Sequence, residues 1–357
     1  MNPTTEYNKA VTLTKALGII LMVFAHAIDN PPEPGIYMGL WRVIYAFHMP
    51  LFFIMSGFCF KELYLEAPVQ FFLRKIKGLY LPFVAFSLVF LAFHNLFRQW
   101  HICEGSEVYR WHDFLVAAWA VIGRMSDGVD LLGTFWFIKE LFFGNLIFYL
   151  VLLLFRRNKW LTAAVLFALT EVLAITGFCI PWFGLTNRTF FAATFITIGY
   201  IIRTTDFRLD KWWKWLLCVV FIVAETAGVN FKMDTQTPWT LPLYLCSAIA
   251  GTMMVYELAV WLEKYIKTSV LTFIGQHTFP VLALHFLSFK LVSLLIIAIY
   301  HLPIESLTAF PVLSTYSFTG WWLVYTLVGL ALPLFLAWLY SLIWQRSLTM
   351  SERTPRG

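Results

Sequence analysis

The stretch AVTLTKALGIILMVFAHAI, residues 10–28, is long and apolar enough to cross a lipid bilayer as one helix. A bilayer core about 30 Å thick needs about 20 mostly apolar residues, each adding about 1.5 Å. Only two side chains in the stretch can carry a charge, Lys15 and His26. The stretch therefore predicts a membrane-spanning helix with ionisable groups at two depths.

Similar apolar stretches recur along the chain and predict about ten spans. The expected spans are 10–28, 37–60, 78–97, 134–155, 160–180, 189–203, 213–230, 239–262, 270–299 and 320–344. Pro280 predicts a kink or a break within the ninth span. The polar connection 98–133 contains Phe114–Met125, which is apolar but too short to span, so we expect a re-entrant or interfacial helix there. The pattern predicts an all-α, polytopic bundle that forms a single transmembrane domain over residues 1–357.

The composition agrees with lipid as the main solvent. Of the 357 residues, 60% are hydrophobic and 13% are charged, whereas a soluble domain has about 25% charged residues. The five cysteines form no CxxC pair, and the eight histidines form no i,i+3 or i,i+4 pair, so neither a disulfide framework nor a metal site is predicted. No phosphate-binding or dinucleotide-binding glycine loop is present. Cysteines beside apolar stretches are interpreted as small hydrophobic residues.

The net charge of +6 is distributed unevenly between the loops. With the N-terminus placed in the cytoplasm, 18 of the 26 Lys and Arg residues fall in inner segments, six fall in outer segments, and two lie within spans. This is the asymmetry of the positive-inside rule. We therefore interpret the charge as a topology signal and not as a nucleic-acid surface. Both termini are expected in the cytoplasm of a multi-pass protein of the inner (plasma) membrane.

Ionisable groups inside spans are functional candidates, because burying them in a membrane is costly. Lys15 and His26 are eleven residues apart, which puts them near one helix face and about 16 Å apart along the axis. Lys15 would lie near the cytoplasmic end and His26 in the outer half. The spacing leaves a structural alternative open, in which Lys15 reaches the headgroups and His26 binds a neighbouring carbonyl.

The second span, WRVIYAFHMPLFFIMSGF (41–58), brings further polar groups from the outer side. Arg42 and His48 would reach a depth similar to that of the first-span histidine, and Pro50 frees a carbonyl that needs a partner. Arg42 could equally be an interfacial anchor. Ser56-Gly57 predicts close helix packing more than it predicts a nucleophile.

The arrangement Lys15-x10-His26, followed by HMPLFFIMSGF (48–58), resembles the membrane acyltransferase family 3. These are bacterial integral-membrane enzymes that O-acylate polysaccharides and other cell-surface glycans. Three later segments also resemble the family: WFI (136–138), FFAATFITIGY (190–200) and IGQHTFPVLALH (274–285). The resemblance covers nearly the whole chain. It departs from the family at Gly78, where members often carry an arginine four residues before a proline.

The resemblance implies acyl-CoA, with acetyl-CoA as the expected co-substrate, and no permanently bound cofactor. It implies a glycan or polysaccharide acceptor and a surrounding of membrane lipids, and we expect no nucleic acid partner. We expect the donor phosphates to be bound by Lys15, Arg74, Lys75 and Lys77, on the cytoplasmic side. His26 is the expected general base, facing a tunnel that is open to the thioester.

Further groups are expected in the outer half of the same site. Glu140 and His285 are expected to complete the catalytic set, and Arg42, His48 and Trp136 to bind the acceptor or an oxyanion. An ion pair between Lys139 and Glu140 and a structural role for His285 are the alternatives. No role follows for the remaining acidic residues of the spans, which are Glu171, Glu225 and Glu257.

A transporter or flippase for a glycan or lipid-linked sugar suits the composition equally well. Many transporters contain inverted repeats with broken helices at matching positions, and we find no such repeat in the sequence. The combination of an inner basic cluster with an outer histidine favours the transferase. The acyl group, the acceptor, the oligomeric state, and the choice between direct transfer and an acyl-enzyme intermediate stay open.

Overall fold

The computed structural model describes residues 3–351 except 33–34, 106, 228–231 and 234–235. Over these residues the prediction of an all-α protein is confirmed, and the extended structure is one isolated bridge between Ile180 and Leu185. The α-helices are α1 (Pro3–Ala27), α2 (Ile36–Tyr45), α3 (His48–Phe58), α4 (Pro68–Lys75), α5 (Leu81–Ala92), α6 (His94–Gln99), α7 (Trp111–Arg124), α8 (Trp136–Leu154), α9 (Lys159–Thr176), α10 (Asn187–Thr205), α11 (Trp212–Ala227), α12 (Leu241–Tyr265), α13 (Ser269–Gln276), α14 (Thr278–Tyr300), α15 (Ser314–Tyr316) and α16 (Trp322–Ser351). Short 3-10 helices cover Glu62–Leu65 and Ile304–Thr308, and π turns cover Ile76–Tyr80 and Ser317–Trp321.

The helices agree with a multi-pass membrane protein. Among the described residues, eight helical stretches are long and apolar enough to cross a bilayer. The other two of the ten predicted spans correspond to α10 and α11. Helix α11 has 16 residues, and α10 carries the buried residues Thr189, Thr194 and Thr197, which make it more polar.

Three predicted spans differ from the observed helices. The span expected at 78–97 is a helical stretch that starts earlier, at Pro68, and continues to Ala92 through α4, a π turn and α5. Because the Pro82 ring would clash with the carbonyl of residue 78 in a regular helix, the chain widens into the π turn there. The second span is broken between α2 and α3. The ninth is broken at His277, as Pro280 predicted.

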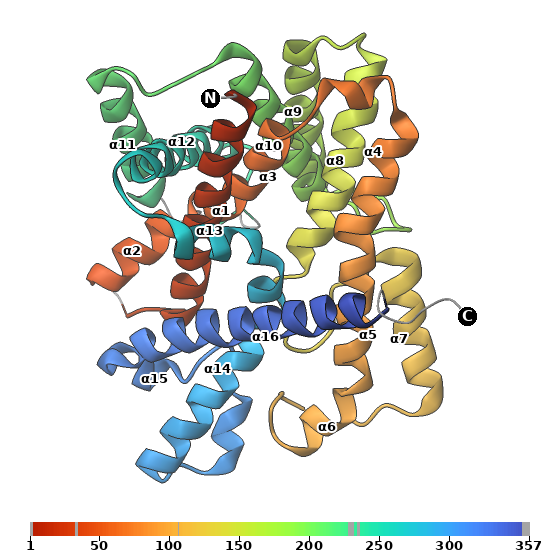
Figure 1. The fold of residues 1–357 in the computed structure, drawn as a ribbon, viewed down its shortest axis with the longest axis vertical. Coiled ribbons are helices and arrows are strands. Elements are labelled where there is room, and N and C mark those ends of the chain that lie inside the picture. Colours follow the sequence, from red (N-terminus) through yellow and green to blue (C-terminus); the bar gives the residue numbers. More distant parts are fainter. Residues whose placement is uncertain (1–2, 33–34, 106, 228–231, 234–235, 352–357) are drawn as a thin grey trace.

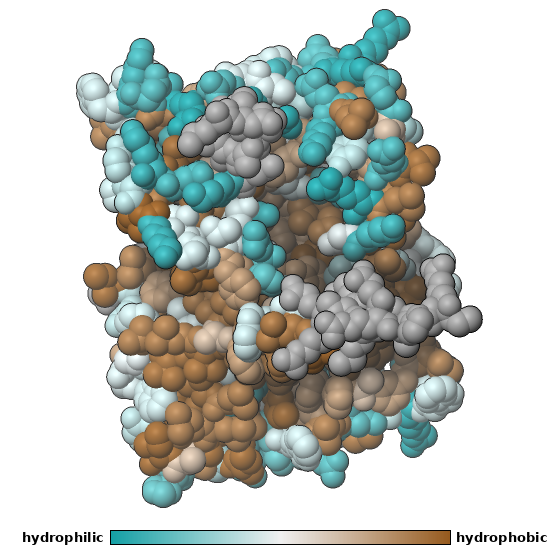
Figure 2. Space-filling view, in the orientation of Figure 1, coloured by the Kyte–Doolittle hydropathy of each residue, from teal (hydrophilic) through white to brown (hydrophobic). Residues whose placement is uncertain are grey.

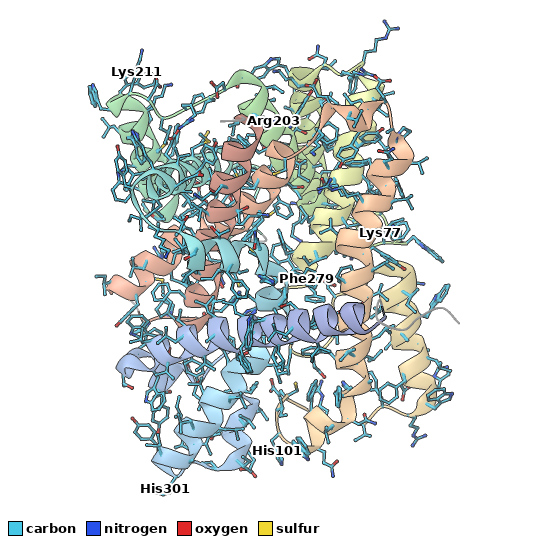
Figure 3. All side chains as sticks on the ribbon, viewed as in Figure 1. Lys77, His101, Arg203, Lys211, Phe279 and His301 are labelled. Atoms are coloured by element: carbon cyan, nitrogen blue, oxygen red, sulfur yellow. The ribbon has the colours of Figure 1, made fainter. Side chains whose placement is uncertain are left out.

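The helices do not all run in one direction. In Figure 1, α1, α8 and α14 run roughly vertically, whereas α16 lies across the view near α14. Figure 2 shows polar residues gathered over the upper end and apolar residues over the lower left, where α14 and α15 lie. Arg203 and Lys211 lie at the upper end, and His101 and His301 at the lower end (Figure 3). Arg203 and Lys211 thus lie at the opposite end from His101 and His301, and the cytoplasmic placement of the termini stays a prediction.

Helices α3 and α10 approach each other backbone to backbone. A Cβ atom added at Gly57 would lie 1.7 Å from the Ile196 carbonyl oxygen, and one added at Gly199 would lie 1.9 Å from the Ile54 carbonyl oxygen. Each helix therefore needs a glycine where the other crosses it. The prediction that Ser56-Gly57 marks close helix packing is confirmed.

Candidate functional site

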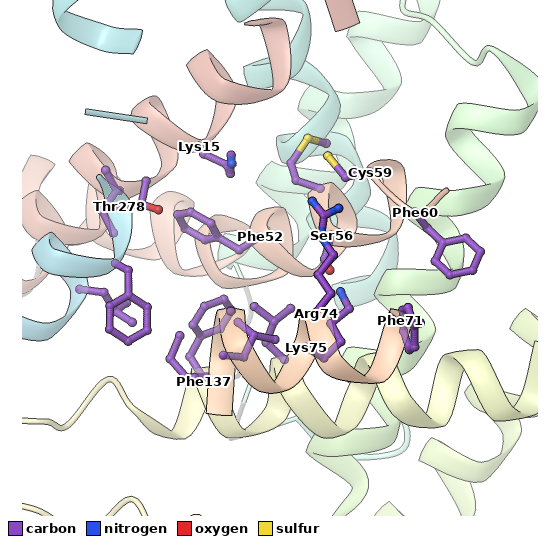
Figure 4. A pocket seen from close by; sticks show the side chains of 18 of the residues that line it. Lys15, Phe52, Ser56, Cys59, Phe60, Phe71, Arg74, Lys75, Phe137 and Thr278 are labelled. Carbon is purple, nitrogen blue, oxygen red and sulfur yellow. The ribbon is translucent and has the colours of Figure 1, made fainter. Parts of the chain in front are cut away.

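A cavity of about 350 Å³, which we call the basic cavity, lies between α1, α3, α4, α8 and α14. Lys15, Arg74 and Lys75 line it, together with Ser56 and Cys59 of α3, as Figure 4 shows. Its aromatic lining consists of Phe52, Phe60, Tyr64, Phe71, Phe137 and Phe279. No acidic side chain is among the described residues that line it. Three cations without a carboxylate make this cavity suitable for an anion.

The three cations come from two helices, α1 and α4. Lys15 comes from α1, and the Arg74 guanidinium donates to the Tyr64 hydroxyl. The Lys75 ammonium lies 5.3 Å from the centre of the Phe71 ring. Lys77, the fourth predicted donor-binding residue, is exposed, is not part of the lining and points away from the molecule in Figure 3. Side chains two residues apart on a helix point to different faces, so Lys75 and Lys77 cannot both face the cavity.

Sequence reasoning missed two contributions to the basic cavity. Cys59 was interpreted as a small hydrophobic residue, but it is exposed and lines the cavity. Gly78, which occupies the family's arginine position, also lines it, and nothing lies within 4 Å of a Cβ built there. The Ser56 hydroxyl donates to the Asn145 side-chain oxygen at 3.1 Å. Ser56 therefore fixes α3 to α8.

Three imidazoles and a phenol form what we call the histidine cluster, which consists of His26, Tyr45, His48 and His285. The His26 and His285 rings stack with their centres 5.5 Å apart. The Tyr45 hydroxyl lies 3.4 Å from His26 Nδ1, and its ring centre lies 4.8 Å from that of His48. The structure thus brings together three predicted site residues from α1, α3 and α14.

Hydrogen bonds to helix carbonyls fix the tautomers of two of these histidines. His48 Nδ1 lies 2.9 Å from the Ile44 carbonyl, and His285 Nδ1 lies 3.0 Å from the carbonyls of Val281 and Leu282. Because a carbonyl can only accept, Nδ1 must carry the proton in both, and Nε2 carries the lone pair of the neutral ring. His285 Nε2 is buried without a hydrogen-bond partner in the described part of the chain.

The basic cavity and the histidine cluster follow the same two helices but are not continuous. Along α1 the cavity lining ends at Ile19, about 10 Å before His26. Along α14 it ends at Leu282, one turn before His285. His26 itself does not line the cavity. The lining thus stops short of His26, and the tunnel that we expected between Lys15 and His26 stays a prediction.

Glu140 and Trp136 are held by an arginine that sequence reasoning placed only as a loop charge. Arg188 Nε donates to the fully buried Glu140 at 3.1 Å. The Arg188 guanidinium also lies 4.6 Å from the centre of the Trp136 ring. The partner of Glu140 is thus Arg188, and the suggested pair with Lys139 is wrong. Adjacent residues of a helix point about 100° apart, which turns Lys139 toward Gly184 instead.

The remaining predicted groups stabilise contacts between elements. Arg42 donates to the Thr226 carbonyl at 3.3 Å, which joins α2 to α11. Glu257 of α12 accepts two hydrogen bonds from Arg208, at 2.8 and 3.0 Å, and so fixes the segment after α10. Glu225 accepts from Gln236 at 3.3 Å.

Comparisons with known proteins add one finding. A family model described as an acyltransferase domain matches residues 8–345, which is nearly the whole chain. No curated protein and no solved structure matches the chain.

Proposed function

Because the chain belongs to acyltransferase family 3, we propose that it is a membrane O-acyltransferase that uses acyl-CoA. It would move an acyl group, most simply acetyl, to a hydroxyl of a sugar or of a surface polysaccharide. The family assignment supports an acyltransferase and so disfavours the transporter alternative. The donor, the acceptor and the residue roles below are parts of the proposal.

The basic cavity supports the donor half of the proposal. Coenzyme A carries several phosphate charges on its nucleotide end, and Lys15, Arg74 and Lys75 supply cations for them. The aromatic walls offer Phe52 to the adenine ring. The pantetheine arm would then follow α1 past Ile19 toward the histidine cluster. It would have to extend beyond the lining of the basic cavity, which ends at Ile19 on α1.

The histidine cluster supports the chemical half. With the His26 proton on Nδ1 and directed at the Tyr45 oxygen, the lone pair on Nε2 is available as a general base. His26 Nε2 would take the proton of the acceptor hydroxyl while the hydroxyl oxygen attacks the thioester carbonyl. The C–S bond then breaks, the ester forms, and the departing thiolate takes the proton back from the imidazolium. His285 would stay neutral, because a second cation 5.5 Å away would repel that imidazolium.

One observation carries the proposal. Three imidazoles lie close together, two of them further along α1 and α14, which both line the basic cavity. His277, outside the cluster, binds the Phe273 carbonyl at 2.8 Å, and His48 and His285 bind helix carbonyls in the same way. The His26 ring instead packs against His285, Phe286 and Tyr45, with ring centres 5.0 to 6.2 Å away. Aromatic packing of this kind holds a catalytic ring in place without using its second nitrogen.

The test compares His26→Ala with His112→Ala in purified protein supplied with radiolabelled acetyl-CoA and an acceptor glycan. His112 is 85% exposed at its side chain and lies outside both the basic cavity and the histidine cluster. Removing the base should lower transfer about 10²- to 10⁴-fold while leaving the Kd for CoA unchanged. Lys15→Ala should instead weaken CoA binding. Undiminished transfer by His26→Ala at wild-type protein levels would overturn the proposed mechanism.

A further inference from the structure

A second cavity, of about 180 Å³, lies between the α5–α6 corner, α7 and the loop before α8. We call it the polar pocket, and its polar lining consists of His94, Arg98, Tyr109, Ser126 and Asp130. Helix α6 lies at the lower end of Figure 1, and His101, just after it, lies at the end of the molecule away from Arg203 and Lys211 in Figure 3. The polar pocket is thus remote from the upper end of the molecule, and the proposed mechanism does not use its residues.

The polar groups of this pocket are held in a fixed arrangement. Asp130 joins two of them, since one carboxylate oxygen lies 2.8 Å from His94 Nδ1 and the other accepts from Arg98 at 3.0 Å. The Tyr109 ring stacks on the His94 ring with centres 3.7 Å apart. Asn95 exchanges two hydrogen bonds with the backbone of Tyr109, at 2.8 and 2.9 Å. The arrangement is therefore preorganised, as a binding site requires.

Three buried side-chain atoms in this arrangement make no hydrogen bond with any described residue. His94 is only 5% exposed, and its Nε2 makes no hydrogen bond with any described residue. The same holds for Nε of Arg98 and for the Asp130 carboxylate oxygen that lies 2.8 Å from His94 Nδ1. Nε2 of a neutral His94 with its proton on Nδ1 can only accept, as can the Asp130 oxygen, whereas the Arg98 N–H can only donate. Such buried orphan groups are costly unless something pairs with them. A hydroxyl group pairs with either kind of atom, because it donates and accepts.

We infer that the polar pocket binds one hydroxyl-rich sugar ring. The charges of Arg98 and Asp130 cancel at 3.0 Å, which favours a neutral polyol over a phosphate or carboxylate. The volume is below the ~300 Å³ typical of drug-sized ligands and fits a single ring. Leu91, Val121 and the Tyr109 ring offer apolar surface to the C–H face of a sugar.

The segment from Asp130 to Gly133 leads from the polar pocket toward the histidine cluster. Asp130 lies three residues before Gly133, where an added Cβ would lie 3.5 Å from the Phe286 ring. The Phe286 ring in turn lies 5.0 Å from that of His26 and 4.0 Å from that of His285, centre to centre. A glycan with one ring in the polar pocket would thus have neighbouring rings near the base. That assignment, of the bound sugar as part of the acceptor, rests on the proposed function.

Binding is measured first without any donor, in full-length His26→Ala protein in nanodiscs, so that no transfer can occur. The probes are methyl α-D-glucopyranoside, methyl β-D-galactopyranoside and N-acetyl-D-glucosamine, with inorganic phosphate as the anion control. We expect at least one sugar to bind in the millimolar range and phosphate not to compete. Failure of every sugar to bind, or displacement by phosphate, overturns the inference.

Matched variants then locate the site. Arg98→Lys keeps the charge for Asp130 but removes the orphan donor, and Ala117→Leu fills the cavity without removing a polar group. Each should raise the sugar Kd at least tenfold, whereas Val116→Leu, on the exposed side of α7, should not change it. Acetyl-CoA binding should stay unchanged in all three. Equal sugar binding by Arg98→Lys, Ala117→Leu and the parent would refute the location.

The two proposals fail in different ways. If a sugar binds in the polar pocket but the wild-type protein transfers no acyl group, the subsite stands and the proposed function fails. If the wild type transfers acetyl and Arg98→Lys leaves the KM for the acceptor unchanged, the proposed function stands and the subsite fails.

Discussion

Replacing Gly57 by alanine tests the backbone contact between α3 and α10, which fixes one wall of the basic cavity. The new Cβ would lie 1.7 Å from the Ile196 carbonyl oxygen, whereas real Cβ atoms essentially never come closer than 3.0 Å. The new Cβ and the Ile196 carbonyl oxygen must therefore move apart by at least about 1.3 Å, the difference between these two distances. Because the carbonyl belongs to the backbone, no change of side-chain rotamer can relieve the clash. We expect a loss of about 3 kcal/mol in the free energy of unfolding, the upper end for overpacking in a core.

The assay is thermal unfolding of the purified protein in detergent, followed by loss of the monodisperse peak in size-exclusion chromatography. Gly39→Ala is the matched control, because Gly39 is also helical and nothing lies within 4 Å of its added Cβ. That control should be neutral or about 1 kcal/mol more stable, as alanine favours helix. Equal melting temperatures for Gly57→Ala and Gly39→Ala would refute the backbone-contact argument.

The reciprocal glycine makes the test sharper. Gly199 meets the Ile54 carbonyl at 1.9 Å in the same crossing. Once Gly57→Ala has forced the helices apart, Gly199→Ala should cost less than it does alone, so the double variant should be more stable than the sum of the single losses predicts. The separation also moves Ser56 and Cys59, so CoA binding should weaken in Gly57→Ala. Strict additivity would mean that the two glycines act separately.

Three further predictions address the cavity and the buried ion pair. Bound CoA should slow maleimide labelling of Cys59, which lines the basic cavity. Cys103 should react slowly at pH 7 with or without CoA, because burial raises the pKa of its thiol to about 11 and the thiolate is the reactive form. Mass spectrometry of the labelled peptides checks both expectations. Gly78→Arg should lower the Kd for CoA several-fold in titrations at low salt and lose that gain at high salt, since it adds a cation where nothing lies within 4 Å of the Cβ. Arg188→Ala should destabilise the protein by about 3–5 kcal/mol in thermal unfolding, because it leaves the buried Glu140 unpaired, and adding Glu140→Gln should recover part of the loss.

The sequence predicts the parts of the fold that depend on local patterns. Hydropathy places helices at each expected span, and Pro280 predicts the break that the structure has at His277. The sequence does not predict that the stretch before Gly78 is helical, because Arg74, Lys75 and Lys77 look like a loop cluster. The structure shows that a helix can carry them when they face a cavity or the surface.

The site depends more on tertiary contacts, which no spacing along the chain reveals. The resemblance singles out His26, His48 and His285, and the structure brings them together. The partner of Glu140 lies 48 residues away, so the adjacent Lys139 was the only candidate visible in the sequence. The extent of the basic cavity, which ends at Ile19 on α1, depends on packing and was likewise not predictable.

The two sides of the basic cavity differ in how much freedom they have. The α3 side is locked, since its backbone touches α10 at Gly57 and Ser56 is hydrogen-bonded to α8. The opposite side is α4, which carries Arg74 and Lys75 and is mostly exposed. The π turn Ile76–Tyr80, which contains an extra residue, follows it directly. A long, branched substrate would therefore enter by movement of α4 about the π turn, while α3 stays in place.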